Sequence, residues 1–450
     1  MPDVVTWQLR AAFARRMADV YGREVPAYTT LVDVSAAVNA DVVARDGALA
    51  ERLGSLERVT AERHGAIRVG TPVEMRQVAH VFRAFGMHPV GFYDLRDAAK
   101  AAVPVVSTAF RPVDADELAR NPFRMFTSLL VTDDRRFFDA SLQQRLDAFL
   151  ARRTLFPPEL ISLADRAVVG GGLDFDDAAR LLELATGAFT LSPEPVDRAW
   201  YRELEQISAV AADIGGVTST HINHLTPRVL DIDELYRRMS ERGITMIDDI
   251  QGPPRWDGPD VLLRQTSFRA LDEQRLFRER DGTVAAGTLR VRFGEVEARG
   301  IALTPAGRDR YDAALREVDV RRAADPATPR AEHARQVWQE RMPSTEAGFE
   351  RDALAYFTYT AGPDGTPAAT PIVYEDFLPR SAAGIFQSNL TDAGTRDDGR
   401  RGSVRDAGWL ADVIGTEVAD PYVLYAAQEE ASRLVLDSDE RAVHWHHLQV

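Results

Sequence analysis

Two six-residue stretches of this chain share the pattern His-x-x-x-Arg-Val, and this repeat restricts the possible folds more than any other feature. The stretches are HGAIRV at 64–69 and HLTPRV at 224–229. Each leads into a run with helical spacing, then a glycine, Gly86 or Gly243, and then another apolar stretch. An internal duplication of this kind predicts two equivalent modules whose first strands face a shared cavity.

The rest of the pattern predicts an α+β protein in which a large helical insertion separates the two modules. Thr71-Pro72 predicts a turn and a helix start after the first hexamer, and MHPVGFYDL reads as a strand. We expect five segments: N-terminal helices at 1–62, a first metal-binding module at 63–111, a helical insertion at 112–215, a second module at 216–310, and a helix with C-terminal strands that complete the core at 311–450.

Composition excludes several classes of protein. The chain has no cysteine, so any metal must be held by histidine and carboxylate side chains. Lys and Arg number 54 against 69 Asp and Glu, and 54 − 69 = −15 argues against binding to nucleic acid or to an anionic membrane. The N-terminus lacks the apolar core of a signal peptide, and no long apolar run follows. We therefore expect a cytoplasmic protein.

The residues that carry chemistry fall on three predicted strands. Residues four apart on a strand point to the same face, so His64 projects with Arg68, and His224 with Arg228. A third strand, RVRFGEVEARG, places Glu295 and the residue two further along on one face. Two histidines and one carboxylate form the facial triad that leaves positions open on Fe(II).

Alternatives remain open at several positions. His221 lies in the same segment as His224 but on the opposite face, and Glu297 has the same period-two position as Glu295. Pro227 removes a ladder hydrogen bond, so its strand should be unpaired on one side there. The C-terminal histidines are interpreted as a frayed tail instead of a metal cluster; they are His444, His446 and His447.

The segment HINHLTPRVLDIDEL resembles the opening of a vicinal-oxygen-chelate module. HGAIRV, NHLTPRVLDID, RFGEVEARG, YEDFLP and GIFQSNL together resemble the 2-oxoadipate dioxygenase/decarboxylase (hydroxyglutarate synthase) family over nearly the whole chain. The resemblance implies paired βαβββ modules around a metal held by His64, His224 and Glu295, with Arg68 on a substrate carboxylate. FGEVEAR is also similar to the closing FxEIxxR strand of 4-hydroxyphenylpyruvate dioxygenases, which favours Glu295 over Glu297.

This resemblance also implies a reaction. The expected enzyme uses Fe(II) and O2 to convert 2-oxoadipate to 2-hydroxyglutarate and CO2, in lysine catabolism. Ser403 is a further candidate for substrate binding, and Gln387, Ser388 and Asn389 are either polar groups around the keto acid or capping residues. Two alternatives stay open: an oxygen-independent, metal-dependent isomerase or lyase, and a small-molecule-binding protein without turnover.

The common signatures of other enzyme classes are missing from the sequence. It contains no GxSxG nucleophile elbow, no GxGxxG dinucleotide fingerprint and no GxxxxGK[ST] phosphate loop. Hydrolase, dinucleotide and NTPase functions therefore have no support in the motifs, and the metal-centred interpretation is the one that the residues favour.

Overall fold

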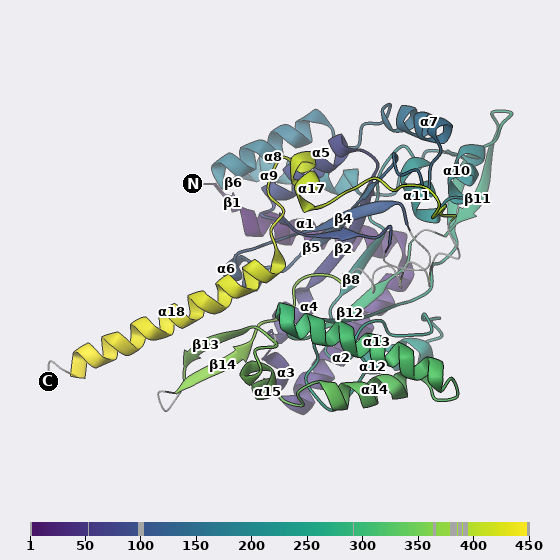
Figure 1. Cartoon of the computed structure of the whole chain (residues 1–450). Coiled ribbons are helices and arrows are strands. Elements are labelled where there is room, and N and C mark those ends of the chain that lie inside the picture. Colours follow the sequence, from purple (N-terminus) through teal and green to yellow (C-terminus); the bar gives the residue numbers. More distant parts are fainter. Residues whose placement is uncertain are drawn as a thin grey trace.

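The structure, a computed structural model, describes residues 2–52, 54–97, 103–290, 292–362, 366–378, 385, 389 and 395–447, with the backbone alone over 437–447. Its helices and strands form a mixed α+β protein (Figure 1). The strands are β1 Val4–Val5, β2 Arg63–Val69, β3 His88–Asp94, β4 Val105–Arg111, β5 Arg124–Leu130, β6 Gly172–Leu173, β7 Val196–Asp197, β8 His224–Pro227, β9 Leu263–Ser267, β10 Glu273–Arg278, β11 Val284–Leu289, β12 Glu295–Arg299, β13 Phe357–Ala361 and β14 Pro367–Pro371. The helices are α1 Thr6–Glu24, α2 Pro26–Asp46, α3 Ala48–Glu51, α4 Leu56–Ala61, α5 Pro72–Ala84, α6 Ala115–Arg120, α7 Ala140–Leu150, α8 Pro158–Gly170, α9 Phe175–Ala188, α10 Arg198–Glu205, α11 Ala209–Gly215, α12 Ile232–Glu241, α13 Pro305–Ala324, α14 Arg330–Arg341, α15 Glu346–Arg351, α17 Ala407–Ile414 and α18 Pro421–His447.

A five-stranded sheet in the order β3-β4-β5-β2-β8 forms the centre of the molecule. Along the chain, this unit consists of β2, α5, β3, β4, the short helix α6 and β5, and β2 closes it by pairing in parallel with β5. Strand β5 lies inside segment 112–215, so our expectation that this segment is a helical insertion is wrong for 124–130. All seven residues of β5 are buried, and a strand covered on both faces lacks the alternation that would have marked it in the sequence.

Helix α5 begins where the sequence predicted a helix start. The Thr71 side chain accepts a hydrogen bond from the main chain of Glu74, and the Glu74 side chain accepts one in return from the main chain of Thr71. This capping box satisfies amide groups that would otherwise be unpaired at the first turn, and Pro72 suits the first helical position. The helix then carries the chain from β2 to β3.

The two copies of the repeated hexamer lie side by side. Strands β2 and β8 pair antiparallel, with His64 opposite Thr226 and Ala66 opposite His224. Directly paired residues point to the same face, and so do residues two apart, so both histidines project from one face of the sheet. Strand β8 is at the sheet edge, which confirms the expectation that Pro227 marks a strand unpaired on one side.

Strand β12 crosses this edge. It pairs antiparallel with β9, and its Glu297 carbonyl accepts a hydrogen bond from the Val229 amide just beyond β8, at 2.8 Å. All five residues of β12 are buried. The strand that carries the candidate carboxylates is thereby fixed beside the strand that carries His224.

The last helix leaves the body of the molecule. Figure 1 shows α18 extending away from the sheet, with its first part beside β13 and β14. The amides of Phe357 and Tyr359 on β13 donate to the side chains of Glu429 and Ser432 on α18, at 3.4 and 3.0 Å. In the part of the chain that is described, no helix has the length and apolar character needed to cross a membrane.

Candidate metal centre

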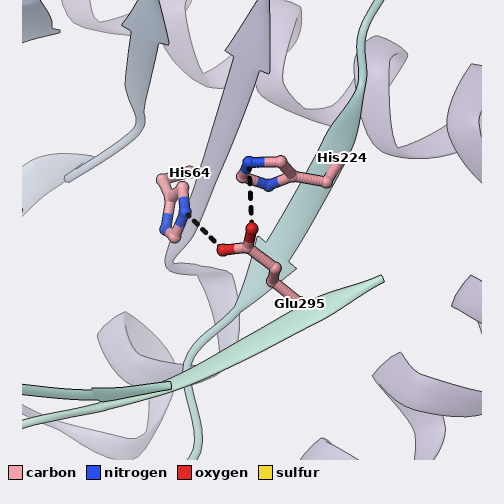
Figure 2. A group of neighbouring side chains, drawn as sticks. All are labelled: His64, His224 and Glu295. Atoms are coloured by element: carbon pink, nitrogen blue, oxygen red, sulfur yellow. Dashed lines mark ion pairs between the residues drawn. The ribbon is translucent and has the colours of Figure 1, made fainter. Parts of the chain in front are cut away.

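His64, His224 and Glu295 converge on one point inside the protein. Their possible ligand atoms all lie within 4.8 Å of one another, and all three residues are buried. The Nε2 atoms of His64 and His224 are 3.8 and 3.3 Å from the two carboxylate oxygens of Glu295. Figure 2 shows the three side chains pointing toward each other from adjacent strands β2 and β8 and from the crossing strand β12. The donor set of two imidazoles and one carboxylate is one that can hold a divalent metal.

The ring of His224 is oriented by its neighbours. Its Nδ1 lies 3.0 Å from the hydroxyl oxygen of Thr226, two residues further along the same strand face. The ring of Phe293 stacks on it at a centroid distance of 5.7 Å. With Nδ1 engaged by the hydroxyl, Nε2 is directed at Glu295, as a metal-ligating histidine requires.

The ring of His64 is held in a similar way. Its Nδ1 lies 3.0 Å from Oε2 of Glu297, and the ring of Phe377 packs edge-on against it at 4.9 Å. A carboxylate on the outer nitrogen of a ligating imidazole fixes the ring and raises its basicity as a ligand. Glu297 therefore supports the centre from behind His64.

Glu295 and Glu297 differ in their charged partners. Glu297 accepts two hydrogen bonds from Arg299, at 2.7 and 3.0 Å, and lies 3.5 Å from Arg124. Burial opposes ionisation of Glu297, but these arginines and His64 outweigh it and lower its pKa to about 2. Burial raises the pKa of Glu295, with His64 opposing the shift. The carboxylate that faces both histidines is that of Glu295, in agreement with the expectation that favoured Glu295 over Glu297.

The pKa values of the two histidines are shifted in opposite directions. Burial, together with the positive charges of His64 and Arg68, holds the pKa of His224 well below its ordinary value. For His64, burial lowers the pKa, but the carboxylates of Glu297 and Glu295 outweigh it, so the pKa is raised. A neutral His224 has the lone pair that a metal needs.

Arg68 lies near the cluster, and its side chain forms an ion pair with Asp213, which is not part of the cluster. Its Nη1 donates to Oδ2 of Asp213 on α11 at 2.5 Å, and both side chains are buried. The carboxylate of Asp213 also accepts a hydrogen bond from the side-chain amide of Asn223, at 2.9 Å. The positive charge of Arg68 lowers the pKa values of both His224 and Glu295, which places the guanidinium in the electrostatic environment of the cluster.

His221, the alternative to His224, is engaged elsewhere. Its Nε2 lies 3.4 Å from Oδ1 of Asp213 and 3.2 Å from the Asn223 amide nitrogen. Burial lowers the pKa of His221 to about 3, against the opposing charge of Asp213. The geometry supports His224, and not His221, as the histidine that faces Glu295.

Three other residues that the sequence singled out, Arg228, Ser403 and Asn389, have their own partners outside the cluster. Arg228 pairs with Glu62 at 2.9 Å. The carbonyl oxygen and the hydroxyl of Ser403 accept hydrogen bonds from Arg96, at 2.7 and 3.2 Å. The Asn389 amide donates to the Ser267 hydroxyl at 2.8 Å, and its oxygen accepts from the Ala270 amide at 2.9 Å, which agrees with a capping role at the end of β9.

Some predicted residues fall outside the description. Gln387 and Ser388 lie outside the described residues. His444, His446 and His447 belong to α18, but their side chains lie outside the described part.

Sequence reasoning missed three supporting residues: Asp213, Phe293 and Phe377. Phe293 stands two residues before Glu295, so the spacing could have indicated its face, because period two applies to it as well. Asp213 lies 145 residues from Arg68, which it holds, and Phe377 is distant in sequence from His64, so no local pattern marks either residue.

Comparisons with known proteins agree over nearly the full chain. The sequence model of the family described as 2-oxoadipate dioxygenase/decarboxylase matches residues 13–389. A Mycobacterium tuberculosis (H37Rv) protein named 2-oxoadipate dioxygenase/decarboxylase is 60% identical over 427 residues, covering 94% of this chain and 98% of that protein. The Escherichia coli K12 protein of the same name is 39% identical, with 95% of this chain and 97% of that protein covered.

A solved structure shares the fold. The crystal structure of hydroxyglutarate synthase from Pseudomonas putida in complex with 2-oxoadipate aligns with a TM-score of 0.81 and 36% identity, over 97% of this chain and 98% of that one. The family match spans well over half of the chain, and the identities extend across it. The chain therefore belongs to the 2-oxoadipate dioxygenase/decarboxylase family.

Proposed function

We propose that this protein converts 2-oxoadipate and O2 to 2-hydroxyglutarate and CO2, with Fe(II) held by His64, His224 and Glu295. The atoms balance, because the six carbons of the diacid become five carbons and one CO2. One observation carries the proposal: two imidazoles and one carboxylate converge within 4.8 Å in a buried site of a chain that belongs to this family. When bound, Fe(II) supplies open coordination positions and one-electron redox chemistry.

The chain's own residues orient and enclose the substrate. Arg68 binds the carboxylate at the far end of 2-oxoadipate through charge-assisted hydrogen bonds, which its planar guanidinium directs. Asp213 holds that guanidinium at 2.5 Å, so Arg68 is positioned before substrate arrives. Phe293 and Phe377 cover the two imidazoles and keep water from their faces.

Ser403 remains part of the proposal as a substrate-binding residue. Arg96 donates to its carbonyl oxygen and its hydroxyl, and Arg96 itself pairs with Asp94 and Asp134, at 2.6 and 2.9 Å. These contacts fix the Ser403 backbone. We also propose that β2–β5 and the segment around β8, α12, β9 and β12 are paired vicinal-oxygen-chelate modules, and that the enzyme acts in the cytoplasm in lysine catabolism.

The pairing of β2 with β8 supports the modular part of this proposal. Each of these strands is the first strand of its proposed module, and each carries one histidine of the cluster. Two first strands in antiparallel contact explain why the hexamer is repeated, because the same local sequence must place an imidazole on the same face twice.

Oxygen uptake tests the function directly. Protein loaded with iron under anaerobic conditions is mixed with a panel of 2-oxo acids, and O2, CO2 and the hydroxy acid are measured. We expect one O2 consumed and one CO2 released for each 2-oxoadipate, and slower turnover of monocarboxylates. Turnover of the acid without O2 consumption would favour an isomerase or lyase, and saturable binding without turnover would favour a binding protein.

A further inference from the structure

A cavity of about 510 Å³ lies outside the metal centre, next to the ion pair that holds Arg68. Its walls come from the end of α7, residues 191–197, α10, the loop at 216–221 and β10. No residue of the His64, His224 and Glu295 cluster lines it. His221 does line it, and the Nε2 atom of His221 is 3.4 Å from Asp213, the partner of Arg68.

Three arginines on the cavity wall lack carboxylate partners. In the part of the chain that is described, Arg152, Arg275 and Arg278 form no ion pair, although carboxylates outnumber basic residues over the whole sequence. Arginines nearer the metal centre behave differently: Arg124 pairs with Glu62 and Arg299 with Glu297, at 2.8 and 2.7 Å. The positive charges of these three arginines are therefore not compensated by a direct ion pair in the described part of the chain.

The acidic residues on the wall are already engaged. The carboxylate of Glu194 accepts a hydrogen bond from the hydroxyl of Thr218 at 2.6 Å. Asp197 caps the first turn of α10, where its side chain accepts from the main chain of Trp200 at 3.0 Å. Arg145, a fourth arginine on the wall, is held by Glu203. Glu194 and Asp197 keep their negative charge, so the three unpaired arginines leave the cavity wall with a formal charge of 3 − 2 = +1.

Arg275 is the most enclosed of the three. It is half-buried, its Nη1 donates only a long hydrogen bond of 3.4 Å to the Ser192 carbonyl, and its Nε is buried with no hydrogen-bond partner. Burial lowers its pKa, against the opposing charge of Glu273. A guanidinium withdrawn from water with unused donors is suited to an anion.

The distribution of these groups indicates the shape of the anion. Arg152 follows α7, whereas Arg275 and Arg278 belong to β10, so cations come from two separate elements. The rings of Phe149 and Trp200 also line the cavity, with centroids 6.1 Å apart. Charged groups on two elements with apolar rings in the same cavity match an acid that has two carboxylates joined by a short aliphatic chain.

We propose that this cavity binds a small dicarboxylate as a second site, distinct from the metal centre. Its volume is within the range of small-molecule sites, roughly 300–1,000 Å³. The inference rests on the proposed function for the length of the acid, because the substrate and product of that reaction are dicarboxylates of six and five carbons. An acid bound here lies beside His221, whose Nε2 atom is 3.4 Å from Asp213, the partner of Arg68.

Binding to the metal-free, full-length protein tests the second site. Equilibrium dialysis with labelled adipate and labelled glutarate measures affinity without iron, O2 or turnover. We expect saturable binding that weakens at least about tenfold in an Arg275→Ala/Arg278→Ala variant, because two charge-assisted contacts are removed. The matched control is Arg316→Ala/Arg322→Ala, which removes the same charge from the exposed face of α13 and should bind normally.

A second measurement locates the ligand. Trp200 lines the cavity, so adipate should change the tryptophan fluorescence of the parent and much less that of Trp200→Phe. Arg68→Ala should keep the binding. Loss of binding in Arg68→Ala but not in Arg275→Ala/Arg278→Ala would place the acid at the metal centre, and no saturable binding would mean no site; either result overturns the inference. Oxygen uptake, measured separately, decides the proposed function.

Discussion

Replacing Glu295 by glutamine should mainly remove the metal, whereas replacing Glu297 by glutamine should mainly lower stability. The two carboxylates are buried on the same strand, and either change removes one negative charge while keeping the shape of the side chain. Glu295 faces the Nε2 atoms of both histidines, whereas Glu297 contacts the Nδ1 atom of His64 and Arg299. The first carboxylate is positioned to hold a metal, and the second to compensate buried cations.

The magnitude for Glu297→Gln follows from its partners. Arg299 donates to both oxygens of Glu297, and breaking a buried ion pair from one side costs about 3–5 kcal/mol of unfolding free energy. Glu62 remains 3.4 Å from Arg299, so we expect the lower end, about 3 kcal/mol. For a chain of 450 residues this corresponds to a Tm lower by about 3 °C. Iron should still bind, but about 10–100-fold more weakly, because His64 loses its outer carboxylate.

Glu295→Gln should lose iron without loss of stability. Among the described residues, the ion pairs of Glu295 are with the two histidines alone, and burial raises its pKa. Exchange of a buried carboxylate that lacks an arginine partner for a neutral amide should change the unfolding free energy by about 1 kcal/mol or less, or increase it. A neutral amide is a poor replacement for an anionic iron ligand.

Two measurements on each purified variant decide the matter. Elemental analysis gives iron per chain after anaerobic loading and desalting, and thermal unfolding of the metal-free protein gives the change in stability. The reasoning is refuted if Glu295→Gln retains iron while Glu297→Gln loses it, or if metal-free Glu297→Gln unfolds at the temperature of the parent.

Four further predictions concern the substrate and the metal. Arg68→Lys should lower kcat/KM for 2-oxoadipate by about 10–100-fold, with iron content unchanged and little loss for monocarboxylates; equal losses for both acids would assign Arg68 a structural role. Asp213→Asn should produce a smaller loss of the same diacid-selective kind, read from the same steady-state assay, because the fork of Arg68 loses its charged anchor. Fe(II) at 100 times its Kd should raise the unfolding free energy of the parent by about 2.7 kcal/mol and that of Glu295→Gln hardly at all, as calorimetry would show. Ser403→Ala should raise KM for 2-oxoadipate while iron content stays constant, and an unchanged KM would remove Ser403 from the substrate site.

Local sequence was sufficient to indicate several elements of the fold. The capping box at Thr71 begins α5 as the sequence indicated, and Pro227 lies on an edge strand because a residue without an amide proton has no place in the middle of a sheet. The repeated hexamer predicted two histidines on equivalent strands. These features depend on interactions within a few residues, which a single sequence records directly.

Strand β5 shows where local pattern failed. It is buried on both faces, so its residues, RMFTSLL, show no alternation of apolar and polar positions with a period of two. Its place in the sheet depends on pairing with β4, the preceding strand, and with β2, which lies much further away in the sequence. Because helices α6 and α7 flank β5 in the sequence, the whole segment was predicted to be helical.

The identity of the ligands needed more than periodicity. Period two places Glu295 and Glu297 on one face alike, and the resemblance to known strands favoured the first. The tertiary structure separates them, because Arg299 and Arg124 approach Glu297, whereas both imidazoles approach Glu295. A strand specifies the face on which a side chain lies, but the groups opposite that face come from other parts of the chain.

The ion pair between Asp213 and Arg68 is the clearest contact that only the tertiary structure reveals. Asp213 lies 145 residues from Arg68, on a short helix whose residues are almost all buried, and nothing around it in the sequence indicates an ion pair. Sequence determined that the chain carries a duplicated histidine strand and the residue types for a metal. Only the packing of α11 against β2 decided which carboxylate holds the arginine, because such contacts depend on distances in space that no local pattern encodes.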